Sequence, residues 1–133
     1  MAQFQLEIMT PDGIEFSGEC ESLLVRTDGG DVEIMRGHTD YFAAVEAGRV
    51  RLILNGEHRY ASASGGFLSV SGGKVRLALI TFEFKEDIDE ARALRAKERA
   101  EAAIAAAKDG AALAIAKARL SRALARISVA QMK

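Results

Sequence analysis

Cysteine, proline and tryptophan are almost missing from this chain of 133 residues, which has one cysteine, one proline and no tryptophan. The single cysteine, Cys20, excludes an internal disulfide framework and is typical of a reducing compartment. No stretch approaches the roughly 20 apolar residues of a membrane span, and the N-terminus lacks the pattern of a signal peptide. The net charge of -1 gives no overall attraction to nucleic acid or anionic lipid. These absences predict a cytoplasmic protein without membrane insertion and without a nucleic-acid partner.

Aromatic residues and glycine are concentrated in the first part of the chain. All eight aromatic residues lie at or before Phe84, and eleven of the twelve glycines lie at or before Gly73. From Asp87 to the end, 17 of 47 residues are alanine. This change in composition predicts two domains, over residues 1–85 and 86–133.

The first domain has the pattern of a β domain. Phe4, Leu6 and Ile8 alternate with polar residues, as in a half-buried strand. Turn signals separate further extended runs: the TPDG sequence of residues 10–13, Asn55-Gly56, Gly72-Gly73 and the glycine pair within residues 23–35. Several short strands at this spacing predict a sandwich or a flattened barrel.

The second domain has the pattern of two helices. Asp87 is predicted to cap the first helix, with Glu90 completing a capping box, and Gly110 is predicted to follow its end. A second helix is expected over residues 111–130, because alanine has the best helix propensity. With a short link, the two helices should form an antiparallel hairpin. The fold class is therefore α+β, a β-sandwich or flattened barrel followed by a helical hairpin.

Alanine dominates the predicted contact between the two helices. At 100° per residue, one face of the first helix carries Ala93, Ala96, Ala100, Ala103 and Ala107, and one face of the second carries Leu113, Ala116, Leu120, Leu124 and Ile127. A buried methyl group contributes only about 0.8 kcal/mol, against roughly 1.5–3 kcal/mol for leucine. Two helices that are stable in themselves but weakly packed against each other suit a movable element. The alternative is a static hairpin packed on the β domain.

Charge is divided unequally between the two domains. Residues 1–86 carry 8 basic and 13 acidic side chains, whereas residues 87–133 carry 10 basic and 6 acidic ones. Arg119, Arg122 and Arg126 occupy a narrow arc of the last helix, without an acidic residue four positions away. Such an unpaired arginine stripe favours an acidic partner surface or a phosphate, and the alternative is a solvated face.

Catalytic and metal-binding patterns are not found in the sequence. His38, His58 and Cys20 show no metal-ligand spacing. The SGGK sequence of residues 71–74 lacks the full phosphate-loop pattern and is interpreted as a turn. We therefore expect no catalytic residues, no metal site and no required cofactor.

Four motifs, in order and over the full length, resemble the ε subunit of bacterial F-type ATP synthase. They are TPDG at residues 10–13, SGGFLSV at 64–70, IDEARA at 88–93 and the C-terminal ARLSRALARISVAQMK at 118–133. Residues 29–42, GGDVEIMRGHTDYF, depart from the family's GxxGILPGHxPL pattern. Gly37-His38 is retained, but the proline and one glycine are missing, which affects the expected loop conformation and its contact with the membrane rotor.

The resemblance implies a non-catalytic rotor subunit on the cytoplasmic face of the bacterial cell membrane. Its sandwich of about ten strands would bind the γ subunit and the ring of c subunits, with His38 facing a partner. The two helices would either fold on the sandwich or extend along γ into the α/β catalytic head, where they inhibit ATP hydrolysis. Arg119, Arg122 and Arg126 would then approach an acidic loop of the β subunit.

The resemblance also implies ATP as a regulatory ligand of the folded hairpin. The matching positions are Glu83, Asp89, Arg92, Arg122 and Arg126. The alternative for this motif is that Asp89 caps the helix and Arg92 pairs with a nearby acid. The alternative for the whole chain is a stand-alone nucleotide sensor with the same fold, and a small β-sandwich enzyme is disfavoured because no catalytic group was found.

Overall fold

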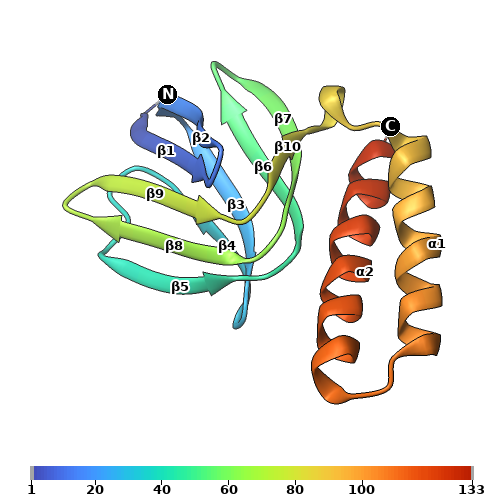
Figure 1. Cartoon of the computed structure of the whole chain (residues 1–133). Coiled ribbons are helices and arrows are strands. Elements are labelled where there is room, and N and C mark those ends of the chain that lie inside the picture. Colours follow the sequence, from blue (N-terminus) through green and yellow to red (C-terminus); the bar gives the residue numbers. More distant parts are fainter. Residues whose placement is uncertain (1, 133) are drawn as a thin grey trace.

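The computed structural model describes residues 2–132, which form ten strands, one short 3₁₀ turn and two helices (Figure 1). The strands are β1 (Phe4–Thr10), β2 (Gly13–Cys20), β3 (Ser22–Thr27), β4 (Gly30–Ile34), β5 (Tyr41–Val45), β6 (Gly48–Leu54), β7 (Glu57–Ala63), β8 (Gly66–Ser71), β9 (Lys74–Leu79) and β10 (Phe82–Phe84). The 3₁₀ turn η1 (Lys85–Asp87) leads into α1 (Glu90–Ala106) and α2 (Gly110–Ala130). The predicted β-sandwich followed by a helical hairpin is confirmed.

One folded sheet forms the sandwich. Its strand order is β10-β7-β6-β3-β5-β8-β9-β1-β2, with β4 paired to β3, and only the β1–β9 pair is parallel. Alternate residues of β1, β6, β8 and β9 are buried. They meet those of the other strands in one core, whose largest fully buried side chains include Leu6, Ile8, Leu23, Ile34, Leu52, Leu68 and Leu77. Each such side chain contributes about 1.5–3 kcal/mol, so the sandwich supplies most of the stability.

The predicted turns lie where glycine and asparagine were expected to place them. Asn55 and Gly56 have φ angles of 52° and 77° and join β6 to β7. Gly72 and Gly73, with φ angles of 57° and 79°, join β8 to β9 in the same way. Two positive φ angles in a two-residue turn match the twist of antiparallel strands, which confirms both hairpins.

The helix ends differ from the prediction in two places. Asp89, not Asp87, caps α1, because its side chain accepts a hydrogen bond from the backbone N–H of Arg92 at 3.1 Å. Asp87 belongs instead to the 3₁₀ turn. Two extended residues, Ile88 and Asp89, lie between Asp87 and the first residue of α1. Gly110 does not end α1; it begins α2, directly after Asp109, whose side chain accepts from the N–H of Ala112 at 2.7 Å.

The helices form an antiparallel pair in which α2 lies between α1 and the sandwich (Figure 1). α2 packs against β6 and β7, and its buried residues are Ala116, Ala123, Ala125 and Val129. Ala93 and Ala100 are the buried residues of α1, so the alanine face of that helix is confirmed. Leu124, which was placed on the contact face of α2, is 45% exposed. The hairpin is thus held mainly by small side chains.

Candidate functional site

An arginine-lined cavity lies where the two helices meet the sandwich. Its volume is about 590 Å³, and it is lined by Ile80, Thr81, Ala96, Arg99, Ala100, Ala103, Arg119, Arg122 and Arg126. Four guanidinium groups therefore border one cavity, and none of its described lining residues is acidic. We call Arg99, Arg119, Arg122 and Arg126 the arginine cluster.

The sequence explains why the arginine cluster forms. Arg119, Arg122 and Arg126 are three and four residues apart, so they share one face of α2. Arg99 comes from α1, because the antiparallel hairpin places the later part of α1 beside the early part of α2. Ala96, Ala100 and Ala103 line the same cavity, and their methyl groups leave the space that longer side chains would fill. Such a basic cavity suits phosphate oxygens, which accept charge-assisted hydrogen bonds from arginine.

Glu83 is the acidic neighbour of the arginine cluster. Its Oε1 lies 3.5 Å from Nε of Arg126, with about one third of each side chain exposed. Glu83 stands opposite Ser62 in the β10–β7 pair. The arginine stripe was predicted to be unpaired because its own helix has no acidic residue four positions away, and that prediction is wrong for Arg126. The pair is worth about 0–1 kcal/mol at such exposure, so another anion can displace it.

The structure brings together part of the residue set implied for ATP. Glu83, Arg122 and Arg126 lie at or beside the cavity, whereas Asp89 and Arg92 are not among its lining residues. The alternative for Asp89 is confirmed, because its carboxylate caps α1. Within residues 2–132, Arg92 has no ion pair. Arg99 was not in the predicted set, although it directly precedes Ala100 of the predicted alanine face, which lines the same cavity.

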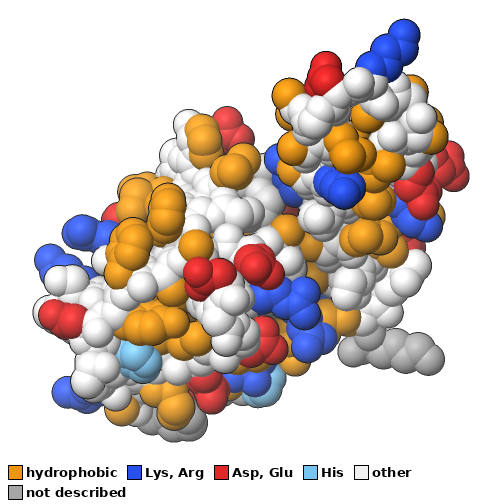
Figure 2. All heavy atoms as spheres, turned by 90° about the horizontal axis from the view of Figure 1, so that it is seen from below, with side chains coloured by type: hydrophobic (Ala, Val, Ile, Leu, Met, Phe, Trp, Pro, Cys, Tyr) orange, Lys and Arg blue, Asp and Glu red, His pale blue; other side chains and the backbone are white. Residues whose placement is uncertain are grey.

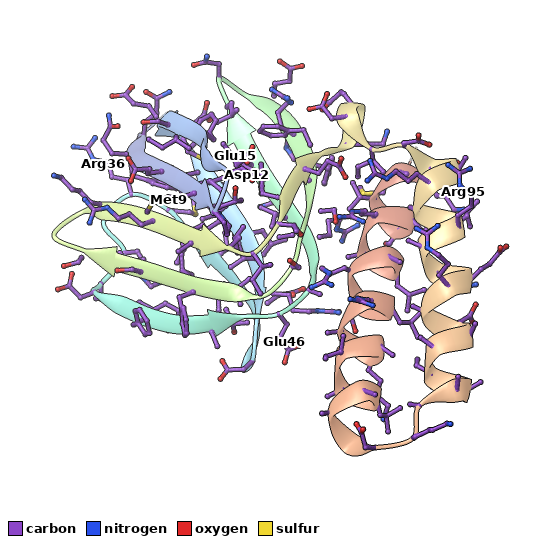
Figure 3. The ribbon with its side chains drawn as sticks, viewed as in Figure 1. Met9, Asp12, Glu15, Arg36, Glu46 and Arg95 are labelled. Carbon is purple, nitrogen blue, oxygen red and sulfur yellow. The ribbon has the colours of Figure 1, made fainter. Side chains whose placement is uncertain are left out.

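Arg122, the middle residue of the stripe, connects this cavity to the sandwich. Arg122 also lines a neighbouring cavity of about 480 Å³, together with Arg26 and Glu46 of the sandwich. Figure 3 shows Glu46 on the side of the sandwich that faces the helices, whereas Arg95 lies on the far side of α1. The stripe therefore faces the sandwich in this arrangement of the hairpin. Arg119 is exposed, and Arg122 and Arg126 are half-buried.

His38 lies in the loop between β4 and β5, away from the helices. Its Nδ1 is 2.7 Å from the carbonyl oxygen of Thr39, and its ring meets the Tyr41 ring edge-on at 5.7 Å. In the same loop, Asp40 accepts a hydrogen bond from the N–H of Gly72 at 3.2 Å. Asp40 thus joins this loop to the β8–β9 turn. Figure 3 shows Arg36 of this loop at the end of the sandwich opposite the hairpin.

The segment that departs from the family pattern also carries an ion pair. Glu33 accepts hydrogen bonds from Ser22 Oγ and Arg51 Nη2, both at 2.6 Å. These contacts, led by the Ser22 hydroxyl and followed by the Arg51 charge, lower the pKa of Glu33 below its usual 4.5. The pair joins β4, β3 and β6 beside the loop that carries His38. The segment that departs from the family pattern is therefore tied to the sandwich at Glu33.

Cys20 is suited to packing rather than chemistry. The thiol is fully buried and donates a hydrogen bond to the carbonyl oxygen of Ser22 at 3.0 Å. Burial raises the pKa of Cys20, which disfavours the reactive thiolate.

An exposed apolar row, which the sequence did not predict, crosses five strands of the sandwich. Ala44, Phe67, Ala78, Met9 and Ile14 are successive cross-strand partners on β5, β8, β9, β1 and β2. Phe42 stacks on Phe67 with ring centres 5.3 Å apart, and these two rings are 68% and 52% exposed. Ile14 is 64% exposed. Figure 2 shows hydrophobic side chains gathered on the sandwich, and such gatherings mark interaction surfaces.

A ten-stranded sandwich with an apolar row, joined to a hairpin with an arginine cluster, defines a two-part binding protein. The family model "ATP synthase, Delta/Epsilon chain, beta-sandwich domain" matches residues 3–85, and "ATP synthase, Delta/Epsilon chain, long alpha-helix domain" matches residues 86–131. The chain therefore belongs to the δ/ε chain family of ATP synthase, as its ε subunit. The ε chain is a non-catalytic subunit of the synthase.

Relatives and solved structures agree with this assignment. The ATP synthase epsilon chain of Ruminococcus albus is 37% identical over 134 residues, which cover 100% of each chain. A chain in the Euglena gracilis mitochondrial ATP synthase (OSCP/F1/c-ring) has a TM-score of 0.82 at 21% identity, over 99% of this chain and 83% of that one. A chain in the central stalk/c-ring structure from Tetrahymena thermophila has a TM-score of 0.69 at 12% identity, over 96% of each. These two structures share the fold.

Neither helix, within residues 2–132, combines the length and apolar character that a membrane crossing requires.

Proposed function

We propose that this ε subunit is a rotor subunit of the central stalk, which couples the catalytic head to the c-ring during proton-driven ATP synthesis. Its partners would be the γ subunit and the c-ring, and it would sit peripherally on the cytoplasmic face of the bacterial membrane. The observation that carries the proposal is the exposed apolar row on the sandwich. A large apolar surface is unfavourable in water, and burial against a second subunit would remove that cost.

The apolar row and the His38 loop suggest two docking surfaces on the sandwich. Phe42, Phe67 and Ile14 offer flat apolar area, which suits a tightly packed and permanent contact such as that with γ. The loop that carries Arg36 and His38 is polar and lies at the end opposite the hairpin. A polar loop suits contact with the exposed ends of the c-ring.

The experiment is co-purification of γ with tagged variants of this chain. Phe67→Ser should reduce the recovered γ at least tenfold, because truncating a buried aromatic anchor typically costs 2 kcal/mol or more, or about 30-fold in affinity. Met35→Ser is the matched control, since Met35 is also exposed (50%) but belongs neither to the apolar row nor to the hairpin. Equal recovery of γ with both variants would contradict the assignment of the apolar row.

Inhibition of ATP hydrolysis is the second part of the proposal. The hairpin packs through alanines, and its arginine stripe contacts the sandwich through half-exposed groups. Separating it from the sandwich therefore costs less free energy than separating a leucine-packed interface would. Extended along γ, α2 would present Arg119, Arg122 and Arg126 to an acidic loop of the β subunit.

Truncation after Lys85 tests this part directly. The sandwich keeps its own core, so the truncated chain should still bind γ. The reconstituted enzyme should then hydrolyse ATP faster than the enzyme with the full chain. Unchanged hydrolysis would remove the inhibitory role and leave the rotor role intact.

The third part is that ATP binds the folded hairpin through the arginine cluster. The triphosphate would take the cavity beside Arg122 and Arg126, and binding would favour the folded arrangement by mass action. Isothermal titration with ATP, with and without Mg²⁺, tests this on the isolated chain. Loss of binding in both Arg92→Ala and Arg126→Ala would support the full residue set that the family resemblance implies. Loss of ATP binding in Arg126→Ala alone would support an ATP site in the cavity that does not include Arg92.

The arginine cluster also favours a second candidate, a nucleotide sensor that works without the synthase. Such a sensor would bind ATP tightly and would not co-purify with γ. Recovery of a stable complex with γ decides against it.

A further inference from the structure

One arginine of the sandwich holds the segment that leads into the hairpin. The guanidinium carbon of Arg59, on β7, lies 4.4 Å from the centre of the Phe84 ring. Nη2 of the same side chain lies 3.5 Å from Oε2 of Glu86. Arg59 therefore contacts both the last residue of β10 and the 3₁₀ turn after it.

The strand pattern explains this position. Arg59 is two residues before Ala61, on the same face of β7, and Ala61 is the cross-strand partner of Phe84. Phe84 is held in place because its ring meets Phe82 edge-on at 5.0 Å, and Phe82 belongs to the core. The ring therefore presents a fixed face, over which the cation is attracted by the π electrons.

The ion pair completes the contact. A hydrogen bond from its own backbone N–H, followed by the charge of Arg59, lowers the pKa of Glu86 below its usual 4.5. Glu86 is therefore ionised near neutral pH, as the pair requires. Beyond it, Ile88 and Asp89 are extended, with φ angles of -78° and -85°, before α1 begins.

The contacts of Arg59 and the ion pair Glu83–Arg126 connect different parts of the chain. Glu83–Arg126 joins the sandwich to α2, so this pair must break when the hairpin leaves the sandwich. Arg59, Phe84 and Glu86 all precede the hairpin, so their contacts can persist after it has left. The part of the chain that must rotate then begins after the 3₁₀ turn.

We propose that Arg59 is a clasp that keeps the 3₁₀ turn (Lys85–Asp87) on the sandwich, so that the hinge of the hairpin lies at Ile88 and Asp89. The clasp holds the 3₁₀ turn whether the hairpin is folded or extended. The inference rests on the proposed function only where it assumes that the hairpin leaves the sandwich.

Amide exchange in the isolated full chain, measured residue by residue by NMR, tests the clasp. The reporter is the Ile88 amide, which donates to the carbonyl of Lys85 and closes the 3₁₀ turn. Arg59→Met should speed its exchange about two- to tenfold, and Glu86→Gln should speed it less, since the stacking on Phe84 remains. The Ala93 amide, in the first turn of α1, should not change.

Arg76→Met is the matched control, because Arg76 is also a strand arginine with a weak partner, Glu7 at 3.9 Å. The clasp is overturned if the Ile88 amide exchanges no faster in Arg59→Met and Glu86→Gln than in Arg76→Met. It is also overturned if Ala93 is accelerated as much as Ile88, since the turn would then not open on its own.

Cross-linking in the reconstituted enzyme tests the hinge. In the double variant Arg59→Cys/Glu86→Cys, a short bifunctional thiol reagent should leave the inhibition of ATP hydrolysis intact. The same reagent on Arg49→Cys/Met132→Cys, whose side chains lie 3.8 Å apart between β6 and the end of α2, should abolish inhibition, because it ties α2 to the sandwich. Loss of inhibition with the first pair would overturn the hinge. If neither uncross-linked variant inhibits, the proposed function fails, whereas the exchange experiment still decides on the clasp.

Discussion

Arg122→Ala is the substitution that most directly tests the arginine cluster as a phosphate site. Arg122 is half-buried, lines the cavity and has no ion pair with a residue in the range 2–132. It can therefore direct its guanidinium to an incoming phosphate without first releasing a carboxylate. A hydrogen bond to a charged group is worth about 1.5–3 kcal/mol, which corresponds to a loss of about 10- to 150-fold in affinity.

Arg126→Ala should have a smaller effect than Arg122→Ala. Arg126 must give up its contact with Glu83 before it can serve the nucleotide, and that contact is worth about 0–1 kcal/mol. The net loss for Arg126→Ala should therefore be smaller by up to about fivefold. This order follows from the Glu83 contact, which the residue spacing on α2 does not indicate.

Isothermal titration of ATP into the isolated chain gives both affinities. Arg95→Ala is the control, because Arg95 lies on α1 away from the cavity (Figure 3). Raised salt should weaken binding to the unmodified chain, since the site is only partly buried. Equal ATP affinity for Arg122→Ala and Arg95→Ala would refute a role of the cavity in binding.

Three further predictions concern the structure that supports these sites. Asp89→Ala should destabilise the hairpin by about 0.5–2 kcal/mol through loss of the cap, whereas Asp87→Ala should have little effect; urea unfolding followed by helical circular dichroism separates the two. Glu33 has a lowered pKa in the folded chain, so its contribution to stability is present above its usual pKa of 4.5 and is lost as the pH falls. Glu33→Gln should therefore lose less stability than the unmodified chain between pH 7 and about pH 3, as measured by thermal melts. Gly66→Ala should prevent stable folding, because its added Cβ would lie 1.9 Å from the backbone oxygen of Ala78, and soluble yield against Gly18→Ala, where the nearest atom is 3.5 Å away in a side chain, checks this.

Local signals in the sequence were sufficient for most of the sandwich. Asn55-Gly56 and Gly72-Gly73 need positive φ angles, which few other residues adopt, so these turns could be predicted without knowledge of distant contacts. The cap of α1 could not be decided in this way, because Asp87 and Asp89 are equally suitable residue types. The 3₁₀ turn that the chain forms after β10 places Asp89, rather than Asp87, at the start of the helix.

The candidate site depends on contacts that a single sequence does not contain. Glu83 and Arg126 are 43 positions apart, and their pairing follows from where α2 lies on the sheet. The apolar row needs the order of five strands, including the parallel pairing of β1 with β9. Periodicity identifies which residues of a strand point outward, but it does not identify the neighbours of that strand.

A ligand at the arginine cluster would strengthen both interfaces of the hairpin, that between its helices and that with the sandwich. α1 and α2 meet through alanine, and α2 meets the sandwich partly through cavities that border the arginine cluster. A triphosphate bound there would contact α1 and α2 at once and would lie beside Ile80 and Thr81 of the sandwich. Its binding energy would therefore add to both weak interfaces together. Because these interfaces are weak, a ligand of moderate affinity could shift the hairpin from the extended to the folded arrangement. If leucines packed the interfaces, the same ligand would change this equilibrium less.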